Sequence, residues 1–182
     1  LGSRGLGDVY KRQIHKTTHF TKEEMEGITK GLAGVDNIEL LQIQEFSAWR
    51  AIRFQNDVAT LFPIQRGTVI PLDKDTFLIW THGSVQHDEL AGKNLNYYKN
   101  GRGIPAPLLV KRFMGKSSAL ELVNEILMLT KMNWNSGDGL YKILPVTLDF
   151  AKALSRVAKQ DLVVYDRPYN LSLIHISEPT RP

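Results

Sequence analysis

The sequence predicts one mixed α/β layer structure, and three observations indicate this fold class. Two capping boxes each open a helical pattern of apolar residues. Several short apolar runs have the length of buried strands. A strand, a helix and a second strand follow one another near the start of the chain, which is the order of a β-α-β unit. The composition, 182 residues of which 42% are hydrophobic and 23% charged, is that of one globular domain.

The first predicted elements are a strand and a helix. The segment Ile14–Thr17 (IHKT) has the pattern of the end of a strand. Thr21 and Glu24 belong to the capping box T-K-E-E, so a helix begins there and runs to about Gly31 or Gly34. A strand after this helix would complete the β-α-β unit.

Four strand-like runs follow the first helix. Ile38–Ile43 is a short apolar run suited to a buried strand, and Trp49–Phe54 alternates well enough for another. Thr68–Leu72 and Thr76–Thr81 flank a polar turn at Asp73–Asp75. These two runs therefore predict an antiparallel hairpin.

The last third of the predicted fold contains a strand and two helices. Pro105 and Pro107 keep the backbone extended before the apolar run Leu108–Val110. Ser118 and Glu121 form the second capping box. The residues expected on the inward face of this helix are Leu120, Val123, Ile126, Leu127 and Thr130. A third helix is expected from about Pro145, with an inward stripe of Leu148, Ala151, Leu154 and Val157 or Ala158.

Composition excludes several classes of protein. The absence of cysteine rules out disulfides, thiolate metal sites and cysteine nucleophiles, and it agrees with a reducing compartment. No window has the roughly 18 consecutive apolar residues that a membrane-spanning helix needs, and no stretch near the start of this sequence has the basic-then-apolar pattern of a secretory signal. We therefore expect a cytoplasmic protein with no membrane partner.

The two ends of the chain are an inverted repeat at the level of the genetic code. Ser3–Gln13 can be written in codons whose reverse complement, read in frame, gives Leu171–Arg181, with all eleven codons matching. This DNA resembles the adaptor that transposases insert during sequencing-library preparation. We therefore interpret residues 1–13 and 171–182 as translated adaptor and residues 14–170 as the natural segment, truncated at both ends. We expect the two adaptor segments to make few contacts with the rest.

Charge is informative by its distribution. The formal net charge is +4, but without the four basic and two acidic residues of the two ends it is +2. From Leu90 to Leu120 no acidic residue occurs, while six basic residues do: Lys93, Lys99, Arg102, Lys111, Arg112 and Lys116. This pattern indicates a local basic surface. A solvated loop followed by a lysine-bearing edge strand accounts for the same charges equally well.

No catalytic motif can be recognised from spacing alone. His15 and His19 stand at a strand-to-cap transition, which separates them as metal ligands. His82 and His87 follow a strand in a Gly-Ser loop and are expected to be exposed. No glycine-rich phosphate loop or nucleophile elbow is present.

The C-terminal half carries a family resemblance. The string ILMLTKMNWNS at Ile126–Ser136, followed by LPVT and a helix beginning LDFAKAL, resembles the end of the PIWI domain of prokaryotic Argonaute proteins. Three further pieces occur in the family's order: IHKT with F-T-x-E-E, then RGT, then LIWTHGS before GIPAPL. The resemblance covers essentially all of residues 14–170. It implies a ribonuclease-H-like mixed sheet with flanking helices, truncated on its N-terminal side, that holds a guide strand paired with its target.

The resemblance also implies what this fragment lacks. Cleaving members of the family use three acidic residues upstream of the IHKT strand and a fourth ligand, usually Asp or His, on the strand after the G-x-P-x-P turn. The best-matching position is Leu109, with Lys111 next on the same face, and no Asp or His occurs from Ile104 to Lys116. Leucine cannot bind the metal ions of two-metal cleavage. We therefore expect that this fragment is not an enzyme and holds no cofactor. In the full-length protein, the resemblance allows a magnesium ion at the site that binds the guide 5′-phosphate.

Seven residues are predicted to bind the nucleic-acid backbone. Four lie at the end of the second helix and in its exit loop: Lys131, Asn133, Asn135 and Ser136. The other three are Arg66 of the RGT motif and, on the basic strand, Lys111 and Arg112. Lys131 also complements the helix dipole, so a purely structural role explains it too. Since Lys111 and Arg112 alternate faces on a strand, at most one is expected to point into a binding channel.

We therefore expect a guide-dependent nucleic-acid-binding fragment of a non-cleaving prokaryotic Argonaute, with guide and target as partners and an effector domain or protein beside it in a defence system. One alternative is a fragment of a guided endonuclease whose acidic residues lie upstream. Another is an inactive interaction domain that shows no salt-dependent binding to oligonucleotides.

Overall fold

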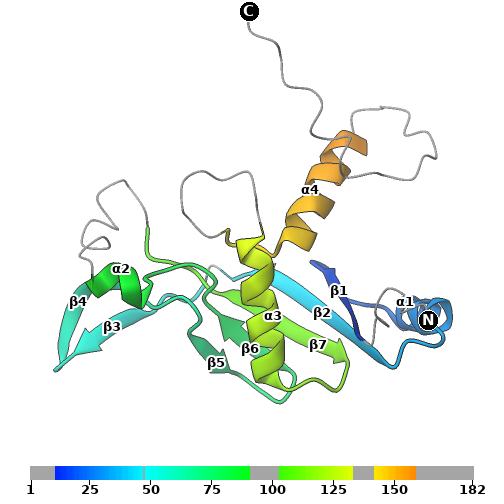
Figure 1. The fold of residues 1–182 in the computed structure, drawn as a ribbon, viewed down its shortest axis with the longest axis horizontal. Coiled ribbons are helices and arrows are strands. Elements are labelled where there is room, and N and C mark those ends of the chain that lie inside the picture. Colours follow the sequence, from blue (N-terminus) through cyan, green and yellow to red (C-terminus); the bar gives the residue numbers. More distant parts are fainter. Residues whose placement is uncertain (1–10, 47, 91–102, 133–141, 159–182) are drawn as a thin grey trace, which may run out of the picture. The chain divides into compact units, whose positions relative to one another are not determined.

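The protein is described by a computed structural model that covers residues 11–46, 48–90, 103–132 and 142–158 (Figure 1). The chain divides into two compact units, Leu1–Asp149 and Phe150–Pro182. Every element described below belongs to the first unit, except that the last helix continues into the second unit from Phe150 onwards.

A five-stranded mixed sheet organises the first unit. Its order is β1-β2-β7-β6-β5, and its strands are β1 (Lys11–Lys16), β2 (Asn37–Glu45), β7 (Leu108–Met114), β6 (Thr76–Ile79) and β5 (Val69–Pro71). Strands β1 and β2 are parallel and are joined through helix α1 (Lys22–Gly31), while the remaining pairs are antiparallel (Figure 1). The β-α-β order, the β5–β6 hairpin and the mixed α/β class predicted from the sequence are confirmed.

Both predicted capping boxes are present. The Thr21 hydroxyl accepts from the Glu24 backbone N–H at 3.2 Å, and the Glu24 carboxylate accepts from the Thr21 N–H at 2.8 Å. Ser118 and Glu121 make the same reciprocal pair at the start of helix α3 (Ala119–Lys131). Each box satisfies two backbone donors that the first turn of a helix leaves without partners.

A second sheet of two strands was only half expected. Strand β3 (Ile52–Gln55) overlaps the predicted run Trp49–Phe54, whereas strand β4 (Val58–Pro63) and the short helix α2 (Gln86–Leu90) were not predicted. Between β3 and β4 the chain turns at Asn56 and Asp57, whose φ values of 50° and 61° match a two-residue hairpin turn. Arg53 of β3 forms an ion pair with Glu89 of α2 at 2.6 Å, which attaches the hairpin to that helix.

The core lies between α3 and one face of the five-stranded sheet. Leu122, Val123 and Ile126 of α3 are buried against this face. The sheet contributes Leu41, Ile43, Phe77, Ile79, Leu108 and Val110, and Leu144 and Leu148 complete the cluster. Leu148 lies in the first turn of helix α4 (Val146–Ala158).

The predicted inward stripes were partly wrong. Leu120 is 70% exposed, and the buried residue of that turn is Leu122. On α4, Leu148 is buried as predicted, while the rest of the predicted stripe, Ala151, Leu154 and Val157 or Ala158, belongs to the second unit and stays a prediction. Leu120 lies at one margin of the predicted stripe, and the sheet meets α3 on the side of Leu122, Val123 and Ile126 instead.

A buried carboxylate fixes the loop that leads into α3. Glu39 of β2 is fully buried, and its Oε1 accepts hydrogen bonds from the backbone N–H groups of Lys116 at 2.8 Å and Ser117 at 2.7 Å. Gly115 passes so close that a Cβ there would lie 1.8 Å from Glu39 Oε2, and its φ is +136°. The loop therefore depends on both residues.

The proposed boundary at residue 13 falls inside β1. Lys11, Arg12 and Gln13 pair with Asn37, Ile38 and Glu39. Gln13 also donates a side-chain hydrogen bond to Glu125 of α3. The expectation that residues 1–13 make few contacts is therefore wrong for Lys11–Gln13, because the strand continues through them; residues 1–10 and 171–182 lie outside the described residues. None of the helices in the described ranges is long and apolar enough to cross a membrane.

Candidate nucleic-acid interface

The ends of β2 and β6 and the start of β7 meet at one edge of the five-stranded sheet, an edge that is formed by strand ends and not by an outer strand. Leu108, the first residue of β7, pairs with Glu45 at the end of β2 and with Ile79 at the end of β6. The segment that follows β6 and the segment that precedes β5 lie at this edge. They contain two of the motifs that carry the family resemblance, THGS and RGT.

These two segments are joined by backbone hydrogen bonds. The Arg66 N–H donates to the Ser84 carbonyl at 2.9 Å, and the Ser84 N–H donates to the Ile64 carbonyl at 3.0 Å. Gly83 makes this approach possible, because its φ is +145° and a Cβ at this position would lie 2.2 Å from the Ile64 oxygen. The RGT segment is thus held in place by its neighbour.

Arg66 connects the RGT segment to the end of α3. Its Nη2 donates to the Leu127 carbonyl at 2.8 Å and to the Thr130 hydroxyl at 2.5 Å. Leu127 and Thr130 belong to the last turns of α3, immediately before Lys131. The structure therefore brings two predicted regions together, although part of the guanidinium of Arg66 is already engaged with the protein.

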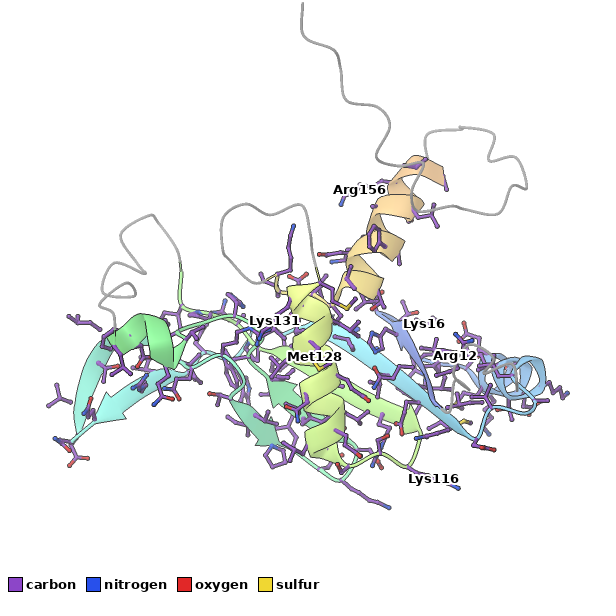
Figure 2. The ribbon with its side chains drawn as sticks, in the orientation of Figure 1. Arg12, Lys16, Lys116, Met128, Lys131 and Arg156 are labelled. Carbon is purple, nitrogen blue, oxygen red and sulfur yellow. The ribbon has the colours of Figure 1, made fainter. Side chains whose placement is uncertain are left out.

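Lys131 lies in the last turn of α3, where a cation complements the negative end of the helix dipole (Figure 2). The predicted residues that follow it lie outside the described residues: Asn133, Asn135 and Ser136. Their contribution stays a prediction.

The two basic residues of β7 point to opposite faces of the sheet, as the strand period requires. Arg112 lies on the α3 side, where its Nη2 is 2.9 Å from the Asp75 carboxylate and its Nη1 donates to the Ser117 carbonyl at 2.6 Å. Lys111 is exposed on the other side, with its Nζ 5.5 Å from the centroid of the Phe113 ring. Only Lys111 presents its cation to solvent from this strand.

The predicted cations therefore do not form one cluster. Arg112 is hydrogen-bonded at the N-terminal end of α3, whereas Arg66 and Lys131 lie at the C-terminal end. The 13 residues of α3 separate these ends by about 20 Å. In Figure 2, Lys131 is labelled at one end of α3, and Lys116, which precedes the helix, is labelled toward the other end.

The positions expected for a fourth catalytic ligand can also be located. Leu109 and Lys111 alternate with the buried Leu108 and Val110 and so share the face opposite α3. Within residues 11–46, 48–90, 103–132 and 142–158, no three His, Asp or Glu side chains gather closely enough to hold a metal ion.

Two histidines have environments that spacing did not reveal. His15 is half-buried between the Thr147 hydroxyl at 2.8 Å and the Gln13 side-chain oxygen at 3.1 Å, and burial lowers its pKa to about 4. His82 was expected to be exposed, but it is half-buried, and burial lowers its pKa while the Glu45 carboxylate opposes the change. The sequence signal that could have indicated this burial is the position of His82 shortly after a strand, where the ends of several strands meet.

Solved structures that resemble this fold include several Argonautes. The chain superimposes on the Argonaute of Clostridium butyricum, solved with a guide DNA and a 19-mer target DNA, with a TM-score of 0.61, 14% identity and 82% of this chain covered. The fold is that of an Argonaute segment. This chain, referred to below as the Argonaute-like segment, also superimposes on Aa-Ago, which was solved with externally bound siRNA. The TM-score is 0.58, with 21% identity over 84% of this chain.

A third Argonaute, from Marinitoga piezophila with a guide RNA and target DNA, gives a TM-score of 0.52 and 14% identity over 81% of the chain. The Argonaute-like segment spans 17–19% of the length of these three proteins. No protein-family model matches the sequence, and no curated protein matches it.

Proposed function

We propose that this chain is the C-terminal part of a PIWI domain and contributes to guide-dependent nucleic-acid binding. The observation that carries the proposal is the shared fold with Argonautes that were solved with guide and target strands. The position of Lys131 next to the Arg66 segment supports it, because sugar-phosphate backbones are bound by cations and amides presented from rigid elements.

The proposed binding reads the backbone rather than the sequence. Lys131 supplies charge from the last turn of a helix that is packed on the sheet, so its position is defined by the core. Lys111 supplies charge from the other face and is a second, separate contact. Sequence specificity then comes from pairing between guide and target.

The same proposal makes the parent protein non-cleaving, because a leucine at position 109, the best match to the fourth catalytic position, supplies no metal ligand. We accordingly assign no catalytic step and no magnesium site to these residues. As a prokaryotic protein without its own nuclease, the parent is proposed to act in cytoplasmic defence through an effector domain or partner.

The test is binding of the 182-residue chain to a short 5′-phosphorylated oligonucleotide, alone and annealed to its complement, at two salt concentrations. Binding should weaken steeply as salt rises, because counterions are released from the phosphates. Lys131→Ala should lower the affinity and reduce the slope of log affinity against log salt by about 1.

Lys30→Ala is the matched control. Lys30 occupies the last turn of α1 as Lys131 does that of α3, so both substitutions remove a cation from a helix C-terminus. If the two variants affected binding equally, Lys131 would only complement the dipole of its helix and would make no specific contact with the nucleic acid. Binding that is absent at low salt would contradict the proposal, and hydrolysis of a paired strand by the parent protein would favour the guided endonuclease instead.

A further inference from the structure

The β3–β4 hairpin turns apolar side chains outward and polar ones inward. On β3, Ile52 is 59% and Phe54 is 63% exposed, whereas Arg53 between them is half-buried. Arg53 forms its ion pair with Glu89 of α2, which lies next to the hairpin (Figure 1). The inner side of β3 is therefore the side of Arg53. An antiparallel sheet with one solvated face ordinarily has the reverse pattern, with its polar side chains outward.

Strand β4 continues this pattern. Leu61 is 73% exposed and Ala59 is exposed as well, whereas Thr60 between them is half-buried. Phe54 pairs with Ala59, so their side chains lie on the same face of the hairpin. Leu61 follows two residues later and shares that face, because side chains alternate along a strand. We call this surface the outer hairpin face, and its residues are Ile52, Phe54, Ala59 and Leu61.

The outer hairpin face is complementary to a second copy of itself. None of its four residues is polar or charged, so two identical faces meet without repulsion between like charges. The buried centres of homodimer interfaces have the same character, since they are apolar and depleted in charged residues. A two-fold axis brings the same patch of both copies together.

The area of the face agrees with a small dimer interface. The exposed parts of Ile52, Phe54 and Leu61 amount to roughly 400 Å², which is within the size range of apolar patches that are often functional. Two copies would thus bury about 800 Å² of apolar surface. Since about 65% of a homodimer interface is apolar, the whole interface would cover about 1,200 Å², the lower limit for specific complexes. The dimer should accordingly be weak and depend on concentration.

We propose that the outer hairpin face is a homodimer interface, in which two hairpins pack face to face about a two-fold axis as a small two-layer β-sandwich. The inference is independent of the proposed function, because neither Lys111 nor Lys131 belongs to this face. Salt separates the two activities. The net charge of +4 makes two copies repel each other, so salt should favour the dimer, whereas it should weaken nucleic-acid binding.

The experiment is sedimentation velocity of the 182-residue chain from about 5 to about 500 µM, at two salt concentrations. The average mass should rise from that of one chain toward that of two, and high salt should not reduce the rise. Amide hydrogen exchange gives a second readout on the unmodified chain. Exchange in β3 and β4 should slow as the concentration rises, while exchange in β7 should stay the same.

Substitutions locate the interface. Leu61→Glu should raise the Kd of the dimer at least about tenfold, because both copies lose an apolar contact and place a charge opposite the same charge. Leu120→Glu is the matched control. Leu120 is 70% exposed on α3, outside the outer hairpin face, so the same substitution there should leave the Kd unchanged.

A chain that stays monomeric over the whole concentration range would overturn the inference. So would a dimer that Leu61→Glu leaves intact, or one that Leu120→Glu weakens to the same extent. The exchange measurement decides even if a variant fails to fold, because concentration-independent exchange in the hairpin contradicts the proposal. Protection of the hairpin by an oligonucleotide in a monomeric chain would assign the face to nucleic acid and reject the dimer.

Discussion

At the scale of single residues, the buried carboxylate of Glu39 accepts two backbone hydrogen bonds from the loop before α3. Glu39→Ala would leave the Lys116 and Ser117 backbone N–H groups without their acceptor, and Ser117 N is buried. Unsatisfied buried donors cost about 1–3 kcal/mol each, so the free energy of unfolding should fall by about 2 kcal/mol or more. Urea denaturation measures this.

The control for Glu39→Ala is Glu26→Ala, which removes an exposed carboxylate and should change stability by less than about 0.5 kcal/mol. Similar losses in both variants would mean that the net charge of the chain, and not the two hydrogen bonds at Glu39, decides the outcome.

His15 predicts a pH dependence. Its pKa is about 4 in the folded chain and 6.5 when unfolded, so between these values the unfolded state binds more protons. Stability from this group is fully present above pH 6.5 and is lost as pH falls toward 4. The free energy of unfolding should therefore rise over this window, and His15→Asn should flatten the rise. An unchanged profile in His15→Asn would assign the dependence to other groups.

At the scale of elements, the capping boxes delimit the helices. Ser118→Ala should destabilise the chain by about 1 kcal/mol, because the Glu121 backbone N–H loses its acceptor at the start of α3. Thermal unfolding compares it with Ser155→Ala, a substitution at an exposed position within α4 that removes no cap. If Ser155→Ala costs as much, the cap at Ser118 is not the cause.

The same boxes explain which elements could be predicted from the sequence. Thr21–Glu24 and Ser118–Glu121 are local signals, since each makes its hydrogen bonds within four residues, and both helices were located from them. Strand β4 has no such signal, because its partner β3 and the Asn56–Asp57 turn define it only once the chain is folded. The inward face of α3 likewise depends on where the sheet lies beneath it, which is why Leu122 was missed.

The candidate interface was less predictable than the fold. Arg66 and Lys131 were selected separately, and nothing in their spacing indicates that Arg66 donates to the last turns of the Lys131 helix. The ion pair that engages Arg112 depends on Asp75, which the β5–β6 turn brings to β7. Such pairings arise between segments far apart in the chain, so they required the structure.

At the scale of the whole molecule, we expect the five-stranded sheet and the two-stranded sheet to differ in local stability. Strands β2 and β7 are central and contain fully buried residues such as Leu41 and Val110. The β3–β4 hairpin is a separate two-stranded sheet with Phe54 63% and Leu61 73% exposed. Amide hydrogen exchange should therefore be slowest in β2 and β7 and fastest in the hairpin. Slower exchange in the hairpin than in β7 would contradict this gradient.

The contact between Gly83 and the Ile64 carbonyl limits which sequences this architecture accepts. Even alanine would have to displace the strand of backbone that carries Arg66. In a library with all twenty amino acids at position 83, selection for folded protein should return glycine. The RGT and THGS motifs, more than a dozen residues apart in the chain, would then be able to pack together only because residue 83 has no Cβ atom.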